Sequence, residues 1–162
     1  MRTKPYEFTI IGIALDGKNG LPTVILRSVD TKNILPLGIG PFEASAIIIE
    51  IENVHPSRPM AHDLLAELFI RHGLKLLNLT VYQKLENDYP ARIEYRKRLR
   101  HYTMEVRPSD GIALAVRLGT PILVSPEVVQ TAEKKASLMD TIENVSTEIL
   151  YFESNNVGAH LM

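Results

Sequence analysis

Residues 34–52, ILPLGIGPFEASAIIIEIE, decide how the chain folds, because extended structure gives way to helical structure within them. Ile34 to Ile39 has the apolar composition of a strand. Gly40-Pro41 follows, and proline is accepted at the first position of a helix. We therefore expect a helix from Pro41 to about Glu52. The β-branched run Ile47-Ile48-Ile49 leaves a strand open as the alternative there.

Two further strands are expected before this point. Tyr6 to Leu15 and Thr23 to Val29 are rich in β-branched residues, and turn residues separate them from each other and from the next strand. Since the connections are short, the first three strands are expected to form an antiparallel meander.

After this point helices and strands mix. A second helix is expected from about Ala61 to a glycine C-cap at Gly73, with Leu64, Leu65, Leu68 and Phe69 on one apolar face. The later expected elements are strands at 74–85, 89–95, 101–106 and 122–124, and helices at 108–119 and 125–136. The pattern predicts an α+β fold, in which helices flank a mixed, mostly antiparallel sheet or a barrel-like sheet.

The chain is expected to divide into a domain at 1–136 and an amphipathic tail at 137–162, whose last ten residues fray. One helical stripe runs along the tail and comprises Leu138, Ile142, Val145, Ile149 and Phe152. A strand at 145–152 is the alternative. Because an apolar stripe must be buried against something, we expect a homo-oligomer, most simply a dimer.

Composition excludes several classes of protein. The 162 residues suit one domain, and the absence of cysteine excludes disulfides, thiolate metal sites and cysteine nucleophiles. A formal net charge of -1 excludes a globally basic nucleic-acid binder. No apolar run approaches the roughly 18 residues that span a bilayer, so we expect a cytoplasmic protein without membrane contact.

One local cluster is strongly basic. It comprises Arg96, Lys97, Arg98 and Arg100, with His101 following and Tyr95 and Tyr102 interleaved. Such a cluster could bind the phosphates of DNA or RNA, with the tyrosines stacking on bases. The alternative is a solvated hairpin end whose charges protect a sheet edge.

Three segments at expected helix starts concentrate polar residues. These residues are Glu43 in the first segment, Arg58, His62 and Asp63 in the second, and Arg107, Ser109 and Asp110 in the third. In one interpretation they are helix caps and ion pairs. In the other, the three helix starts converge on a cleft. The arginines and Ser109 would bind phosphate, Glu43, Asp63 and Asp110 would hold Mg²⁺ or Mn²⁺, and His62 would move a proton.

The ordered set of motifs resembles the bifunctional nuclease domain family. The matching stretches are LPLGIGPFE at 35–43, RPMAHDLL at 58–65, RPSDGIALA at 107–115 and GTPILV at 119–124, and the resemblance covers about residues 6–131. Two positions depart from the family pattern: Ala61, which usually carries Thr or Ser, and Gly111, which usually carries Ala. Neither departure removes a candidate acid, base or arginine.

The resemblance implies a compact α+β fold, frequent oligomerisation, and the nuclease activity on DNA and RNA described for plant members. We therefore expect a nuclease that hydrolyses phosphodiester bonds, with metal assistance as part of the expectation. The alternative is a non-catalytic oligomeric module that binds a small anionic ligand or a partner protein, with the same residues acting as caps and ion pairs.

Overall fold

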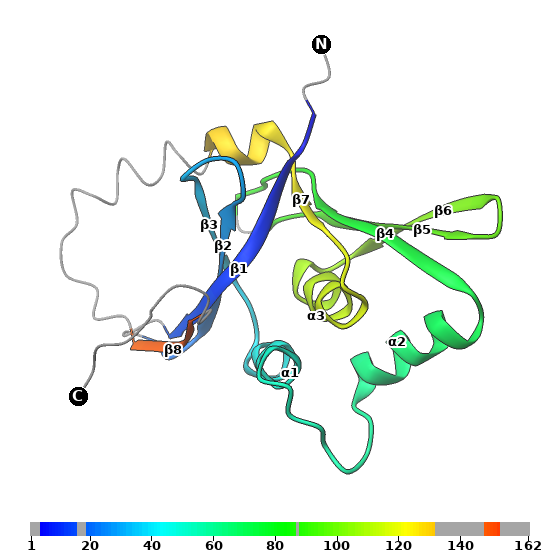
Figure 1. The fold of residues 1–162 in the computed structure, drawn as a ribbon. Helices are drawn as coiled ribbons and strands as arrows, with labels where there is room; N and C mark the ends of the chain where they lie inside the picture. Colours follow the sequence, from blue (N-terminus) through cyan, green and yellow to red (C-terminus); the bar gives the residue numbers. More distant parts are fainter. Residues whose placement is uncertain (1–3, 16–18, 87, 132–147, 153–162) are drawn as a thin grey trace, which may run out of the picture.

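A computed structural model describes residues 4–15, 19–86, 88–131 and 148–152, and Figure 1 shows their arrangement. The elements in chain order are β1 (Tyr6–Leu15), β2 (Pro22–Ser28), β3 (Ile34–Gly38), α1 (Pro41–Ile51), α2 (Ala61–Arg71), β4 (Leu74–Val81), β5 (Ala91–Lys97), β6 (Arg100–Val106), α3 (Pro108–Leu118), β7 (Ile122–Val124) and β8 (Glu148–Phe152). A short helix covers 126–131 between β7 and β8.

The strands build one mixed sheet in the order β3-β2-β1-β7-β4-β5-β6, and β8 also pairs with β1. Only the pairing of β4 with β7 is parallel, and every other pair is antiparallel. β7 pairs with the start of β1 at Tyr6–Phe8, and β8 pairs with its end at Gly12–Leu15. The path ends at β3 and β6, so the sheet is open. The expected α+β class with a mostly antiparallel sheet is confirmed. Of the two sheet shapes that the sequence left open, the structure has the open sheet and not the barrel-like one.

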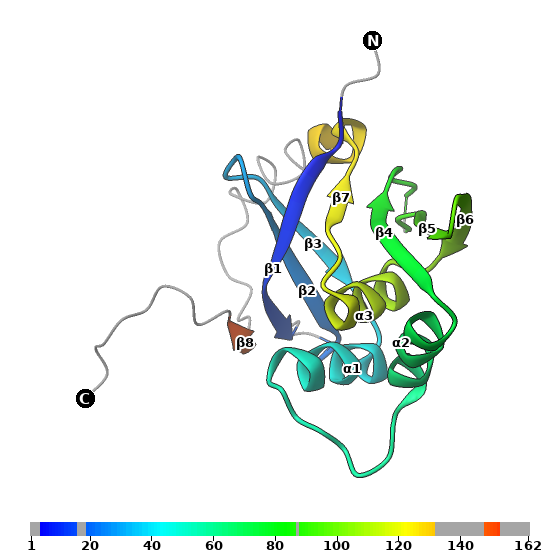
Figure 2. The same cartoon turned by 45° about the vertical axis from the view of Figure 1, so that its right-hand side comes forward.

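The three long helices lie together on one side of the curved sheet, with α3 between α1 and α2 (Figure 2). Ile112, Ala113 and Ala115 of α3 are fully buried at the centre of this layer. Gly111 brings α3 close to β4, because a Cβ atom at this position would overlap a methyl group of Leu79. Because α3 contacts both α1 and α2, its packing determines where the three helix starts lie relative to one another.

The β-branched run of residues 47–49 is helical. Pro41 stands at the first position of α1, and Ala44, Ala46 and Ile47 are buried against the core. Since Ala44 and Ile47 are three residues apart, they share one helix face, and burial of that face outweighs the weak helix preference of isoleucine.

The expected apolar face of α2 is only partly correct. Phe69 is buried, but Leu64, Leu65 and Leu68 are exposed by 53%, 40% and 51%. The other buried residue of α2 is Ala66, three positions before Phe69. The buried side of α2 is therefore narrow and consists of Ala66 and Phe69, while the three leucines point to solvent.

The described residues after β7 form a short helix before the expected tail and a strand within it. The short helix at 126–131 lies near the C-terminal end of the domain, within the expected range 125–136. Residues 148–152 form β8, so the strand alternative is the one observed for this segment. Leu138, Ile142 and Val145 lie outside the described residues. Within the described ranges, no helix is long and apolar enough to cross a membrane.

Candidate functional site

A guanidinium group joins the first and third helix starts. Arg107 places Nη1 3.0 Å from Oε1 of Glu43, at the start of α1. On its other side, Nε and Nη2 of Arg107 donate hydrogen bonds of 2.7 and 3.1 Å to the carboxylate of Asp110. The side chain is 68% exposed, whereas that of Glu43 is 16% exposed. Arg107 therefore bridges two carboxylates and still faces solvent.

The second helix start joins the same network through a histidine. Nε2 of His62, in the first turn of α2, lies 3.1 Å from Oδ1 of Asp110. The side chain of His62 is 18% exposed. A carboxylate at this distance orients the imidazole ring through a hydrogen bond. Glu43, Arg107, Asp110 and His62 thus form one continuous polar chain across α1, α3 and α2, which we call the helix-start network.

Local sequence explains why these groups meet. Pro41 and Pro108 open α1 and α3, and their N-caps, Gly40 and Arg107, form no side-chain capping bond. Acidic side chains in the first turn favour the positive end of a helix dipole. The first-turn acids Glu43 and Asp110 thus satisfy the capping interpretation and also face the shared network.

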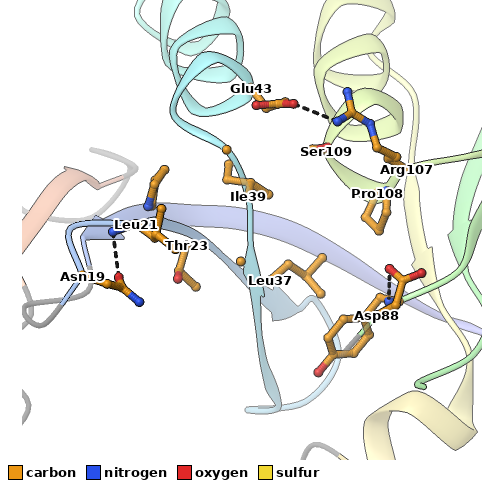
Figure 3. A pocket seen from close by; sticks show the side chains of 14 residues that line it. Asn19, Leu21, Thr23, Leu37, Ile39, Glu43, Asp88, Arg107, Pro108 and Ser109 are labelled. Carbon is orange, nitrogen blue, oxygen red and sulfur yellow. Dashed lines mark hydrogen bonds and ion pairs between the residues drawn. The ribbon is translucent and has the colours of Figure 1, made fainter. Parts of the chain in front are cut away.

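Two residues of the helix-start network, Glu43 and Arg107, line a cavity of about 540 Å³, whereas His62 and Asp110 lie behind Arg107 and do not line it. Figure 3 shows Glu43 and Arg107 paired at one side of it and Ser109 beside them. The remaining wall is mainly the β2–β3 region and the segment before β5: Asn19, Leu21, Pro22, Thr23, Leu37, Gly38, Ile39, Gly40, Asp88, Tyr89 and Pro108. Pockets for small-molecule ligands usually have volumes of about 300–1,000 Å³, and this cavity lies within that range.

The structure corrects the role expected for Asp63. Its Oδ1 accepts a 2.7 Å hydrogen bond from Nε of Arg117, and its Oδ2 accepts one of 2.8 Å from the backbone N–H of Met60. Arg117 is only 3% exposed. Asp63 is therefore the partner of a buried cation and closes the N-terminus of α2, as the capping interpretation predicted.

The three carboxylates expected to hold Mg²⁺ or Mn²⁺ do not converge. Asp63 binds Arg117, while Arg107 separates Glu43 from Asp110. Among the described residues, no group of three His, Asp or Glu side chains has the arrangement of a metal site. A cation between Glu43 and Asp110 would have to displace a guanidinium group, so this donor set does not fit a metal in the observed arrangement.

Two other expected elements of the site lie elsewhere. Arg58 is exposed in the loop between α1 and α2 and does not line the cavity. The basic cluster covers the end of β5, the turn and the first residue of β6, whereas Arg107 follows the opposite end of β6. Arg107 is seven positions after Arg100 along an extended chain that rises about 3.3 Å per residue. Arg100, the nearest residue of the basic cluster, is therefore about 23 Å along the strand from the helix-start network.

Hydrogen bonds and nearby positive charges lower the pKa values of two aspartates, Asp110 and Asp63. Burial raises the pKa of Asp110, but hydrogen bonds from Arg107 and His62 and their charges hold it below its ordinary value. For Asp63, burial is likewise outweighed by the hydrogen bonds from Arg117 and Met60 and by the charge of Arg117, so its pKa is also lowered. Hydrogen bonding to Asp110 raises the pKa of Arg107.

These shifts predict the sign of the acid dependence of stability. A lowered pKa in the folded state means that the unfolded state binds more protons as pH falls. The contribution of Asp63 and Asp110 is complete above the ordinary aspartate pKa of about 4 and is lost as pH falls through their lower folded pKa values. We expect the melting temperature of Asp110→Asn to depend less on pH between 5 and 2 than that of the wild type. Parallel curves of melting temperature against pH would contradict this.

Sequence reasoning missed two parts of the site. Arg117 was not singled out, because a single arginine between Val116 and Leu118 on a helix carries no local signal of burial. The cavity wall around Leu21, Leu37 and Tyr89 was also missed, since apolar loop and strand residues become a wall only through long-range pairing.

Comparisons of the sequence with known proteins identify a family and several relatives. The model of a family described as the bifunctional nuclease domain matches residues 24–137. An uncharacterised protein of Mycobacterium tuberculosis, found in strains CDC 1551 / Oshkosh and ATCC 25618 / H37Rv, is 32% identical over 126 residues, which cover 78% of this chain and 75% of that protein. Bifunctional nuclease 2 of Oryza sativa subsp. japonica is 28% identical over 107 residues, which cover 64% of this chain and 33% of the rice protein.

Proposed function

The chain belongs to the bifunctional nuclease domain family, and from this premise we propose that it hydrolyses phosphodiester bonds in DNA and RNA at the helix-start network. The observation that carries the proposal is the convergence of an acid–base pair and an exposed arginine. His62 with Asp110 supplies the pair, and Arg107 supplies the cation beside a cavity of about 540 Å³.

Each residue of the network has a chemical role in the proposed reaction. His62 accepts a proton from the attacking water, and Asp110 orients the imidazole as a positioning residue. Water forms the new bond to phosphorus while the bond to the leaving sugar oxygen breaks in line with it. The leaving oxygen takes a proton from solvent, and His62 returns the proton that it accepted to solvent. Arg107, whose guanidinium is exposed, binds the non-bridging oxygens as their negative charge increases. Glu43 holds Arg107 in place from the α1 side.

Metal assistance would require Arg107 to move away from Glu43 and Asp110. Mg²⁺ or Mn²⁺ would supply additional neutralisation of the phosphate charge. In the observed arrangement Arg107 already occupies the position between Glu43 and Asp110, so we assign no step to a metal. The assay with and without a chelator decides this point.

A second candidate function is ligand binding without catalysis. The cavity favours it, because its volume suits a small anionic molecule and both Glu43 and Arg107 are internally paired. In that case Arg107 and the free amides of the α1 and α3 starts would hold the anion, and His62 with Asp110 would serve only to join α2 to α3.

We expect purified protein to cleave single-stranded DNA and RNA, and Arg107→Ala to lower kcat/KM by about 10²–10³-fold, since removal of one preorganised donor of charge stabilisation costs this much. Cleavage is measured with Mg²⁺, with Mn²⁺ and with EDTA. The matched control is Arg71→Ala: Arg71 is 72% exposed and paired with Glu67 on α2, away from the network. Equal losses in both variants, or an activity unchanged by Arg107→Ala, would contradict the assignment and favour the second candidate function.

A further inference from the structure

The two edges of the sheet differ in how they are protected. β3, at one edge, carries Pro36, which has no N–H to offer a further strand. β6, at the other edge, contains no proline, and Arg100 to Glu105 are all exposed. Among the described strands, β6 pairs only with β5. β6 is therefore the edge at which another strand can add.

The helix layer stops one strand short of this edge. Phe69 of α2 contacts Tyr95 of β5 edge-on, with ring centres 5.5 Å apart. Tyr95 in turn stacks on Tyr102 of β6 at 5.3 Å. None of the described helices covers the next position: Tyr102 is 39% exposed and Met104, on the same face, is 51% exposed. The edge strand thus presents an apolar face as well as free backbone groups.

The turn between β5 and β6 determines which backbone groups are free. Lys97 pairs with Arg100 across the two turn residues Arg98 and Leu99. In a two-residue hairpin each residue of this closing pair donates its backbone N–H to the C=O of the other. In an antiparallel ladder hydrogen-bonded pairs alternate with non-bonded pairs. The N–H and C=O groups of His101, Thr103 and Glu105 therefore point away from β5, toward the free edge.

We propose that a second copy of this chain pairs with β6, antiparallel to it, about a two-fold axis at Thr103. In this register Thr103 of each copy faces Thr103 of the other in a hydrogen-bonded pair. Two seven-residue edges then become the centre of one continuous sheet, and both helix layers lie on the same side of it.

The sequence of β6 is self-complementary in this register. His101 of each copy lies opposite Glu105 of the other, which gives two symmetric pairs of basic and acidic side chains. Tyr102 lies opposite Met104 in a non-hydrogen-bonded pair, where side chains approach most closely, and aromatic–thioether contacts are favourable. Within its own copy Glu105 accepts a hydrogen bond from Tyr82, which fixes its position at the edge.

Other registers lose this complementarity. A shift of two residues keeps the helix layers on one side, but it places His101 opposite either Thr103 or Arg107. The first alternative has no charge pair, and the second brings two basic groups together. The register about Thr103 is therefore the one selected by charge and packing.

The proposed dimer places the basic cluster of one copy beside the helix-start network of the other. The functional meaning of this placement rests on the proposed function. If Arg100 lies beside Val106 of the second copy, then Arg98 and Leu99 follow beside Arg107 and Pro108 of that copy. The basic cluster, about 23 Å from its own network along the strand, is thereby placed next to the network of the partner. A nucleic acid bound at one network would contact the hairpin of the other copy.

Cysteine cross-linking tests the register, because the wild-type chain contains no cysteine. In a hydrogen-bonded antiparallel pair the two Cα atoms are about 5.5 Å apart, which suits a disulfide. Under mild oxidation we expect Thr103→Cys to cross-link most of the chains into dimers. His101→Cys is the matched control: its two copies would be four residues out of register, about 13 Å apart, and should remain uncross-linked. Equal yields from the two variants, or no dimer from Thr103→Cys, would overturn the proposed register.

Light scattering tests the interface without any introduced thiol. We expect the wild type to be dimeric at about 100 µM and Met104→Lys to be monomeric, with its circular dichroism spectrum unchanged. Val54→Lys is the control, since Val54 in the loop between α1 and α2 has a similar exposure, 53% against 51%. A monomeric wild type, or a dimer that survives Met104→Lys, would overturn the proposal. Neither measurement uses nucleic acid, so failure of the nuclease proposal would leave both results intact.

Discussion

Asp63→Ala is expected to lower the free energy of unfolding by about 3–5 kcal/mol, because it leaves a buried cation without its partner. Arg117 is 3% exposed, and its Nη2 atom already has no hydrogen-bond partner in the described structure. Its Nη1 atom donates to the carbonyl of Ala113, so Asp63 supplies the only carboxylate in the observed arrangement. For a chain of this size the loss corresponds to about 6–20 °C in melting temperature.

A double variant separates the ion pair from packing. Replacing both partners of a buried pair by apolar residues is often neutral or stabilising. We therefore expect Asp63→Leu combined with Arg117→Met to recover most of the stability that Asp63→Ala loses. Urea unfolding of the wild type and both variants measures the difference. A double variant as unstable as Asp63→Ala would show that the carboxylate acts through the cap of α2 rather than through Arg117.

His62→Ala is expected to reduce phosphodiester cleavage by about 10²–10⁴-fold, the range lost when a general base is removed. The effect should lie mainly in kcat, since Arg107 and the cavity would still bind substrate. Asp110→Asn should cause a smaller loss, because Asp110 acts by orienting His62 at 3.1 Å rather than by accepting the proton itself. Single-turnover cleavage of a labelled oligonucleotide measures both.

The control for this experiment is His55→Ala, which removes an exposed histidine from the loop between α1 and α2. Its activity should equal that of the wild type. A His62→Ala variant that keeps full activity while Arg107→Ala loses it would assign the proton transfer to another group and leave the phosphate-binding role in place. Loss of helix signal in His62→Ala would instead indicate that the contact with Asp110 is needed to dock α2.

Much of the fold could be predicted because local signals agreed with tertiary packing. Proline at the first helical position located α1 and α3, and turn residues separated the first three strands. The extent of β4 was less predictable. Its apolar pattern continues to Leu85, but the strand ends at Val81. Val81 is also the last residue of β4 that pairs with β5, so strand pairing rather than composition determines where β4 ends. Tertiary packing, which buries Ala66 and Phe69, likewise determined that the leucines of α2 face outward.

The residues that make up the candidate site could be predicted from the sequence better than the role of each residue. Glu43, His62, Arg107 and Asp110 were all indicated by polar residues at helix starts, and they meet in one network. The role of Asp63 was not predictable, because spacing alone does not reveal that its partner is Arg117, 54 residues later. Distances between helix starts depend on how α3 packs, and that packing depends on contacts such as Gly111 with Leu79.

The three-residue strand β7 has a consequence for the order of folding. It is the piece that joins the N-terminal meander β1–β3 to the second meander β4–β6, by pairing with β1 on one side and β4 on the other. Each meander is built from contacts between chain neighbours and can form early, whereas β1 and β7 are separated by more than a hundred residues. Pairings over such sequence separations are slow to form, because a long loop must close first. During synthesis the two halves of the sheet therefore remain separate until Val124 has left the ribosome, and the edges of β1 and β4 are open to wrong partners until then.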